Sequence, residues 1–167
     1  MGDEVHEVKE KVHAVYLYRL LTLIGTAIVR NLIDDRCSDT PLTTLLARER
    51  KVIKNLRAAR IITKVQFDLL YLKRGIPPTT ADFDLTLAIC LLRSLKHFGL
   101  KPMYTPQPGD TSLEADLCRL RMYRNELAHS FSFLTAGIQE QEFNDKWIDI
   151  EGVCSQKYNN VQLESFN

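Results

Sequence analysis

One segment of the 167-residue chain indicates the fold most clearly: Ser112-Leu-Glu-Ala-Asp-Leu-Cys-Arg-Leu-Arg-Met-Tyr-Arg-Asn-Glu-Leu-Ala-His129. Asp110 or Thr111 can cap a helix here, and Glu114 stands where the capping-box partner of Thr111 belongs. At about 100° per residue, the apolar residues fall within one stripe of the helix, which consists of Leu113, Leu117, Leu120, Leu127 and Phe131. The segment therefore predicts a long helix that packs one face against a core.

The same helix carries polar residues in unusual places. Arg124 lies in the middle of the apolar stripe, where an arginine is costly unless it is paired with an acid or reaches a cleft. Asn125 and His129 are four residues apart and share a different face with Cys118 and Met122. This second low-charge face could meet another helix of the chain or another subunit. A salt bridge from Arg124 to a neighbouring helix is the structural alternative to a functional site.

The rest of the chain also has helical signals. Seven glycines and six prolines leave few turn residues, and the alternation typical of strands is absent. Thr40 before Pro41 and Thr63 are candidate N-caps, Thr80 or Asp82 could begin a further helix, and Gly99 is a candidate helix end. We expect an all-α bundle of about four main helices plus short ones, in one domain over residues 1–167, with helices near residues 3–31, 41–57, 65–71, 83–97, 110–129 and 139–154.

Composition excludes several classes of protein. The net charge of +1 excludes a uniformly basic nucleic-acid-binding surface. Cysteines at 37, 90, 118 and 154 form no Cys-x-x-Cys pair, which favours a reduced, cytoplasmic protein without a structural zinc. The longest apolar run, Leu20 to Val29, is shorter than the roughly 20 residues of a membrane span. We expect no membrane contact and no cofactor. We also expect no metal ion, because His6 and His13 are better explained as surface histidines than as metal ligands.

Positive charge is nevertheless concentrated in one segment. Residues 48–64 hold seven cations against Glu49 alone, a net charge of 7 − 1 = +6; the cations are Arg48, Arg50, Lys51, Lys54, Arg57, Arg60 and Lys64. Such a patch attracts phosphates even in a neutral protein. We predict RNA contacts from Lys51, Lys54 and Arg57, and from Arg121 on the helix described above. The alternative is a solvated helix face that acids elsewhere balance.

The hexapeptide Arg124-Asn125-Glu126-Leu127-Ala128-His129 resembles the Arg-polar-x(3)-His signature of HEPN domains. The chain is similar to the HEPN domain of DAZ-interacting zinc-finger ubiquitin ligases over about residues 15–153, including residues 65–71, 83–87 and 142–147. This resemblance implies an all-α bundle that forms homodimers, in which the signature helices of two subunits meet at a shared cleft. It also implies RNA as the partner: many relatives are metal-independent ribonucleases, whereas others only bind RNA or serve as interaction modules in immune-type signalling proteins.

The resemblance leads to a mechanistic hypothesis of RNA transesterification. His129 would remove the 2′-OH proton, because the ordinary histidine pKa is about 6.5. Arg124 would hold the phosphate, and Asn125 would orient the imidazole or the substrate. Arg124 and His129 are about 140° apart on one helix, which favours a site composed of two subunits. The alternatives are a non-catalytic RNA-binding, dimerisation or adaptor module of a larger signalling or ubiquitin-ligase protein and, more distantly, a transferase partner in a toxin–antitoxin pair.

Overall fold

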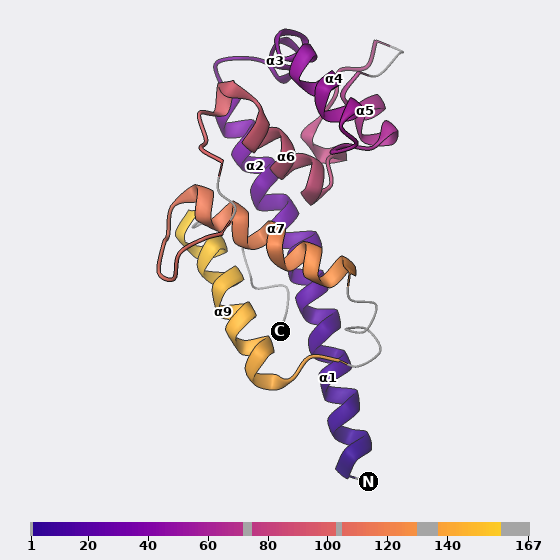
Figure 1. Ribbon diagram of the computed structural model, residues 1–167, viewed down its shortest axis with the longest axis vertical. Helices are drawn as coiled ribbons and strands as arrows, with labels where there is room; N and C mark the ends of the chain where they lie inside the picture. Colours follow the sequence, from indigo (N-terminus) through magenta and orange to yellow (C-terminus); the bar gives the residue numbers. More distant parts are fainter. Residues whose placement is uncertain (1, 72–74, 103–104, 130–136, 158–167) are drawn as a thin grey trace. The chain divides into compact units, whose positions relative to one another are not determined.

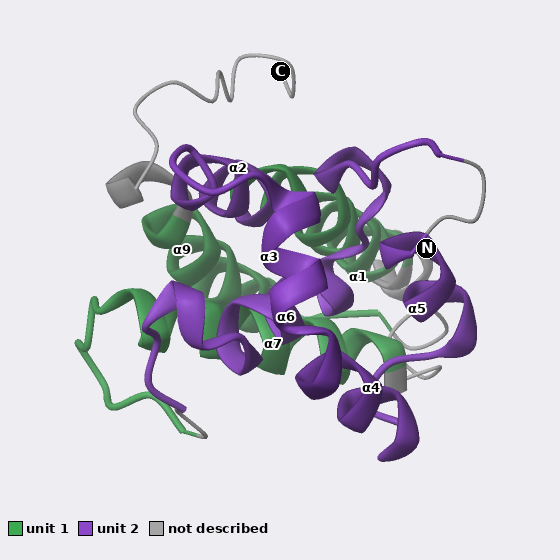
Figure 2. Ribbon diagram, turned by 90° about the horizontal axis from the view of Figure 1, so that it is seen from above, with its two compact units in different colours: residues 1–28, 103–167 green, residues 29–102 purple. Residues whose placement is uncertain are grey.

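The computed structural model describes residues 2–71, 75–102, 105–129 and 137–157, which form helices and the segments that join them (Figure 1). No strand occurs among these residues. The predicted all-α fold is confirmed. Contacts group the chain into two compact units, residues 1–28 with 103–167 and residues 29–102 (Figure 2). The expectation of one domain over residues 1–167 stays a prediction.

The first unit is built on a long N-terminal helix. α1 (Gly2–Arg19) passes through a π-helical stretch, η1 (Leu20–Gly25), into α2 (Thr26–Arg36), so the helix predicted for residues 3–31 is longer than expected. α7 (Leu113–His129) and α9 (Glu140–Lys157) both pack against η1, and α9 also packs against α1 and α7. Gly25 is buried in η1, where the side chain of Leu120 lies next to it. The π-helical stretch thus supports the helix that carries the signature.

A tight contact positions the start of α9. The backbone N–H of Ile138 donates to the carbonyl oxygen of Glu10 at 2.9 Å. Gly137 precedes it with φ 82°, and a Cβ at this position would overlap the α1 backbone at Glu10. Only glycine combines this backbone conformation with so close an approach. His13 stacks on Phe143 with a ring-centroid distance of 4.5 Å, which further fixes α9 against α1.

The N-terminus of α7 is capped one or two residues later than predicted. The Ser112 hydroxyl accepts from the backbone N–H of Ala115, and the Asp110 carboxylate accepts from the N–H of Ser112. Hydrogen bonds from Ser112 hold the pKa of Asp110 below its usual value. Arg119 donates to the carbonyl oxygens of Asp110 and Gln107 at 2.6 and 3.1 Å. This arginine therefore fastens the preceding loop to the helix.

The second unit begins with the end of α2 and continues through two short basic helices. α3 (Leu42–Arg48) and α4 (Arg50–Ala58) replace the single helix predicted for residues 41–57. Glu49 leaves the helical conformation at φ −92° and ψ 11°. The helix bends at this residue, but the N–H of Glu49 still donates to the carbonyl oxygen of Leu45, and the N–H of Ile53 donates to the carbonyl oxygen of Glu49. The apolar periodicity therefore continues across the bend. Pro41, rather than Thr40, is the N-cap residue of α3.

The remaining elements of this unit follow their capping residues. α5 (Lys64–Leu70) begins at the predicted Thr63, which forms a capping box with Gln66. Asp84 caps α6 (Leu85–Ser94), so this helix starts later than Thr80 or Asp82, which lie in a short 3-10 turn, η2 (Thr80–Asp82). α6 ends at Ser94 and a second 3-10 turn, η3 (Lys96–Phe98), follows, so Gly99 in the left-handed conformation ends this turn and not the helix predicted for residues 83–97.

One helix, Val8–Arg36, is long and apolar enough to cross a membrane by length and composition. The sequence expectation rested on the shorter apolar run and did not anticipate this. More than half of the most apolar window, 56%, is buried within the protein, as in the core helix of a folded domain. The absence of membrane contact stays a prediction.

Candidate functional site

The N-terminal half of α7 is buried on more than one side. The predicted stripe residues Leu117 and Leu120 lie in the core, whereas Leu113 and Leu127 are half-buried and Phe131 lies outside the described residues. Cys118, assigned to the second face, is fully buried, while Met122 one turn later is 43% exposed. The second face thus meets the protein's own helices at Cys118 and opens to solvent further along α7.

Arg124 and Asn125 are the two signature residues that the structure brings together. The guanidinium of Arg124 donates to the side-chain oxygen of Asn125 at 3.1 Å, and both side chains are half-buried. Arg124 makes no ion pair with any residue in the described part of the chain. The salt bridge considered as an alternative is therefore not found there. Among the described residues only the side-chain oxygen of Asn125 has a hydrogen-bond partner, which leaves its NH2 group for a further one.

The acid inside the signature is neutralised by α9. Lys146 lies 2.7 Å from the Glu126 carboxylate and 3.3 Å from that of Glu142, and its side chain is only 13% exposed. Lys146 also lies 5.3 Å from the centre of the Tyr123 ring. This pairing compensates the negative charge of Glu126, the acid within the signature segment of α7.

A second link joins α7 to α9 on the same side. The Tyr123 hydroxyl donates to the carboxylate of Asp149. Burial first, and then the bond to Asp149, raises the pKa of Tyr123 above its usual value. The sequence analysis missed Tyr123, Lys146 and Asp149. Their spacing was a usable signal, because Tyr123 and Glu126, like Lys146 and Asp149, are three residues apart and share a helix face.

The structure describes less of the other two predicted site residues of α7, His129 and Arg121. His129 is the last residue of α7, and its side chain lies outside the described part. Arg121 is half-buried, and its Nε atom is shielded from solvent without a hydrogen-bond partner in the described structure. Its role in RNA contact stays a prediction.

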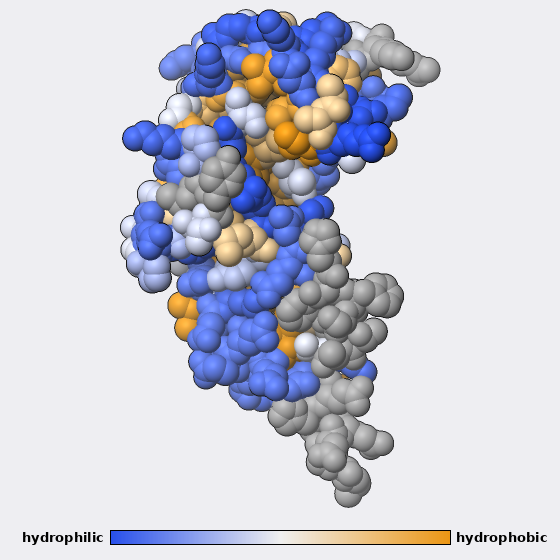
Figure 3. Space-filling view, in the orientation of Figure 1, coloured by the Kyte–Doolittle hydropathy of each residue, from blue (hydrophilic) through white to orange (hydrophobic). Residues whose placement is uncertain are grey.

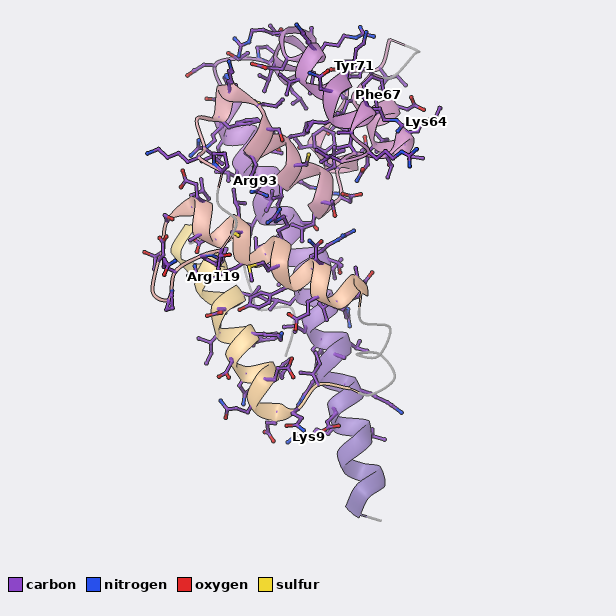
Figure 4. The ribbon with its side chains drawn as sticks, in the orientation of Figure 1. Lys9, Lys64, Phe67, Tyr71, Arg93 and Arg119 are labelled. Atoms are coloured by element: carbon purple, nitrogen blue, oxygen red, sulfur yellow. The ribbon has the colours of Figure 1, made fainter. Side chains whose placement is uncertain are left out.

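The cations of the second unit differ in how they are held. Arg48 lies 3.2 Å from the ring of His97, Arg50 lies over the ring of Tyr71, and Lys64 pairs with Asp68 at 2.7 Å (Figure 4). Lys51 and Lys54 are exposed and Arg57 is half-buried; none of the three has an ion-pair partner among the residues that the structure describes. Arg60 is also exposed and has no ion pair in that part of the chain, so RNA contact by Lys51, Lys54 and Arg57 stays a prediction.

His13 is not the surface histidine that the sequence predicted, and the side chain of His6 lies outside the described residues. His13 is half-buried, stacked on Phe143 and 3.2 Å from the carbonyl oxygen of Ile138, so its role is structural. Within the described ranges no group of three metal-ligating side chains occurs.

Comparison with known proteins decides the family. The sequence model of DZIP3/hRUL138-like HEPN domains matches residues 39–156, well over half of the chain. The chain belongs to this HEPN family. The match runs from just before α3 to the last turn of α9, so it includes both the HEPN signature in α7 and the basic helices α3 and α4. No curated protein and no solved structure gives a significant match.

Proposed function

We propose that this HEPN domain acts on RNA as a metal-independent endoribonuclease, with a site formed by the C-terminal half of α7 in two copies of the chain. The arrangement of Arg124 carries the proposal. Its guanidinium is held by Asn125, while Lys146 neutralises the adjacent Glu126. A positive group that is fixed before the substrate arrives is suited to stabilise a pentavalent phosphate.

The reaction follows from these groups. His129 of one copy takes the proton from the ribose 2′-OH, whose oxygen then attacks phosphorus. The bond from phosphorus to the 5′ oxygen breaks, and His129 of the second copy supplies the proton to that oxygen. Arg124 stabilises the negative charge on the non-bridging oxygens. The products are a 2′,3′-cyclic phosphate and a free 5′-OH, and no metal ion takes part.

The second unit contributes affinity in this proposal. Lys51, Lys54 and Arg57 on α4 form no ion pair with any described residue, and such groups bind the phosphate backbone without reading its sequence. RNA binding by α4 is thus separable from cleavage at α7. Substitutions on α4 test binding, and substitutions on α7 test cleavage.

The direct test uses purified dimer and a labelled RNA in the presence of EDTA. Wild type is expected to cut the RNA but not a DNA of the same sequence, because DNA lacks the 2′-OH. The His129→Ala protein is expected to bind RNA without cutting it. Equal cutting by the two proteins, or cutting of the DNA, would refute the proposal.

One observation favours the adaptor alternative. α1 exposes apolar side chains along its length, with Val8 62% and Val15 47% exposed, a surface of the kind that protein partners cover. If the wild-type dimer neither cuts nor binds RNA while α1 variants lose a protein partner, the domain is an interaction module.

A further inference from the structure

Unit 2 contains a groove of about 340 Å³ that none of the predicted site residues lines. Its walls come from α3, the first residue of α4, the end of α5 and residues 75–78. The lining residues are Thr43, Leu46, Ala47, Arg50, Leu70, Tyr71, Gly75, Ile76, Pro77 and Pro78. In space-filling view, apolar surface lies among hydrophilic surface over this unit (Figure 3).

Most of the groove is apolar. Leu46 and Leu70 are buried at its base, and Ile76 at its edge leaves 64% of its surface exposed. Pro77 and Pro78 have no backbone N–H, so these two residues offer only apolar surface and carbonyl oxygens. An exposed isoleucine beside a hollow is a ready contact for an apolar side chain of a partner.

The polar end of the groove is fixed in place. The Tyr71 hydroxyl donates to the carbonyl oxygen of Leu46 at 2.9 Å. The Arg50 guanidinium lies 4.8 Å from the centre of the Tyr71 ring, and the Phe67 ring lies 5.0 Å from it (Figure 4). The ring of Tyr71 is therefore already contacted by two neighbours, which makes it a poor platform for stacking a nucleotide base.

Arg50 has no ion-pair partner in the part of the chain that the structure describes. Beyond it on α4 lie Lys51 and Lys54, while Glu49 is the one acid of the segment from Arg48 to Lys64. Charge complementarity at this end of the groove therefore favours a carboxylate. A peptide that has an apolar side chain and an acidic side chain close together matches an apolar hollow with a stacked arginine at one end.

We propose that this groove binds a short segment of a partner protein, with an apolar side chain against Leu46 and Ile76 and a neighbouring Asp or Glu carboxylate on Arg50. The bound segment of the partner protein contacts residues of unit 2 only. The groove therefore works independently of the RNA chemistry proposed for α7. The domain would thereby be brought to an acidic protein partner.

The test selects ten-residue peptides from a displayed random library on the full chain, and measures the dissociation constant of an enriched peptide by fluorescence anisotropy. The expected peptides pair an Ile, Leu or Phe with a nearby acidic residue. Binding is expected to weaken at least tenfold with Ile76→Glu and with Arg50→Gln. Lys54→Gln is the matched control, because it removes the same charge from α4 but does not line the groove, and is expected to change binding less than twofold.

Folding is checked by circular dichroism, and methyl signals of Ala47 and Ile76 are expected to shift with the peptide. Four results would overturn the proposal: no enriched peptides; enriched peptides without acidic residues; an effect of Lys54→Gln as large as that of Arg50→Gln; or displacement of the peptide by a ten-residue uridylate RNA. The last would make the groove part of the RNA surface.

Discussion

The C-terminal half of α7 and the helix α4 both carry positive charge, but they hold it in opposite ways. On α7, Arg124 is half-buried and bonded to Asn125, and the adjacent acid is paired with Lys146. On α4, Lys51 and Lys54 extend into solvent without an ion pair to any described residue. A fixed cation is suited to a transition state, whereas mobile exposed cations supply affinity. The predictions below test this division of roles.

The largest effect is expected at α7. Arg124→Ala removes the fixed charge, so the rate of RNA cleavage at saturating RNA is expected to fall by about 100-fold or more. The dissociation constant for RNA is expected to change by less than about threefold, because one phosphate contact is lost among several. Arg57→Ala is the control, because it removes one positive charge from α4 and is expected to leave the cleavage rate at saturating RNA unchanged. If Arg124→Ala and Arg57→Ala changed the cleavage rate equally and the dissociation constant for RNA equally, α7 and α4 would not have the separate roles proposed.

The next effect is expected at α4. Reversing three charges, with Lys51→Glu, Lys54→Glu and Arg57→Glu, is expected to weaken RNA binding at least about tenfold. The slope of log affinity against log salt is expected to become shallower by about 2, at about 0.7 per phosphate contact on single strands. Lys64→Glu, at a residue already paired with Asp68, serves as the control. Unchanged binding of the triple variant would remove α4 from the RNA surface.

A smaller effect concerns the support of α7 by α9. Lys146→Ala leaves Glu126 without its partner, and is expected to lower the free energy of unfolding by about 1 kcal/mol in denaturant titrations. Cleavage is expected to slow several-fold as well, because an unpaired carboxylate at Glu126 then opposes the binding of a phosphate to the same half of α7. Lys9→Ala breaks an exposed pair with Glu140 and is expected to change neither quantity measurably. A cleavage rate unaffected by Lys146→Ala would show that Glu126 does not need to be neutralised.

The smallest effect is expected in the ionisation of Tyr71. It tests whether Arg50 is held in place over the Tyr71 ring, as Arg124 is held by Asn125. Burial raises the pKa of Tyr71 from 10 to about 12, against a smaller opposing effect of Arg50. The raised pKa stabilises the fold below pH 10, and this contribution is lost as the pH rises through about 12. In an absorbance titration of tyrosine ionisation, Tyr71→Phe is expected to remove one late-titrating group. Removal of an ordinary group titrating near 10 would show that Tyr71 is solvated, and that Arg50 is not held over a buried ring.

The fold was predictable because helical signals are local. The apolar spacing and the N-cap at Thr63 depend on a few neighbouring residues, and both are confirmed, whereas Gly99 ends a 3-10 turn and not the helix predicted for residues 83–97. The bend at Glu49 was not predictable, because the hydrogen bonds and apolar spacing continue across it. The cap of α6 was misplaced because three polar residues compete there and only Asp84 receives the N–H of Leu87.

The candidate site was predictable as a set of residue types but not as a geometry. The position of Arg124 on an otherwise apolar face marked it from the sequence alone. Its bond to Asn125 depends on side-chain conformation, and the pairing of Glu126 with Lys146 joins residues twenty apart on different helices. The three-residue spacing on each helix shows which residues share a face, but it does not show which residues of the other helix they contact.

The measurement that tests the central claim most directly is the chemistry of the cut ends. Labelled RNA is incubated in EDTA with wild type and with Arg124→Ala and His129→Ala, and the 3′ ends of the fragments are identified by mass spectrometry. We predict 2′,3′-cyclic phosphate ends from wild type and uncut RNA from both variants. Intact RNA with wild-type dimer, 3′-hydroxyl ends, or cyclic phosphate formed at an equal rate by either variant would contradict the account.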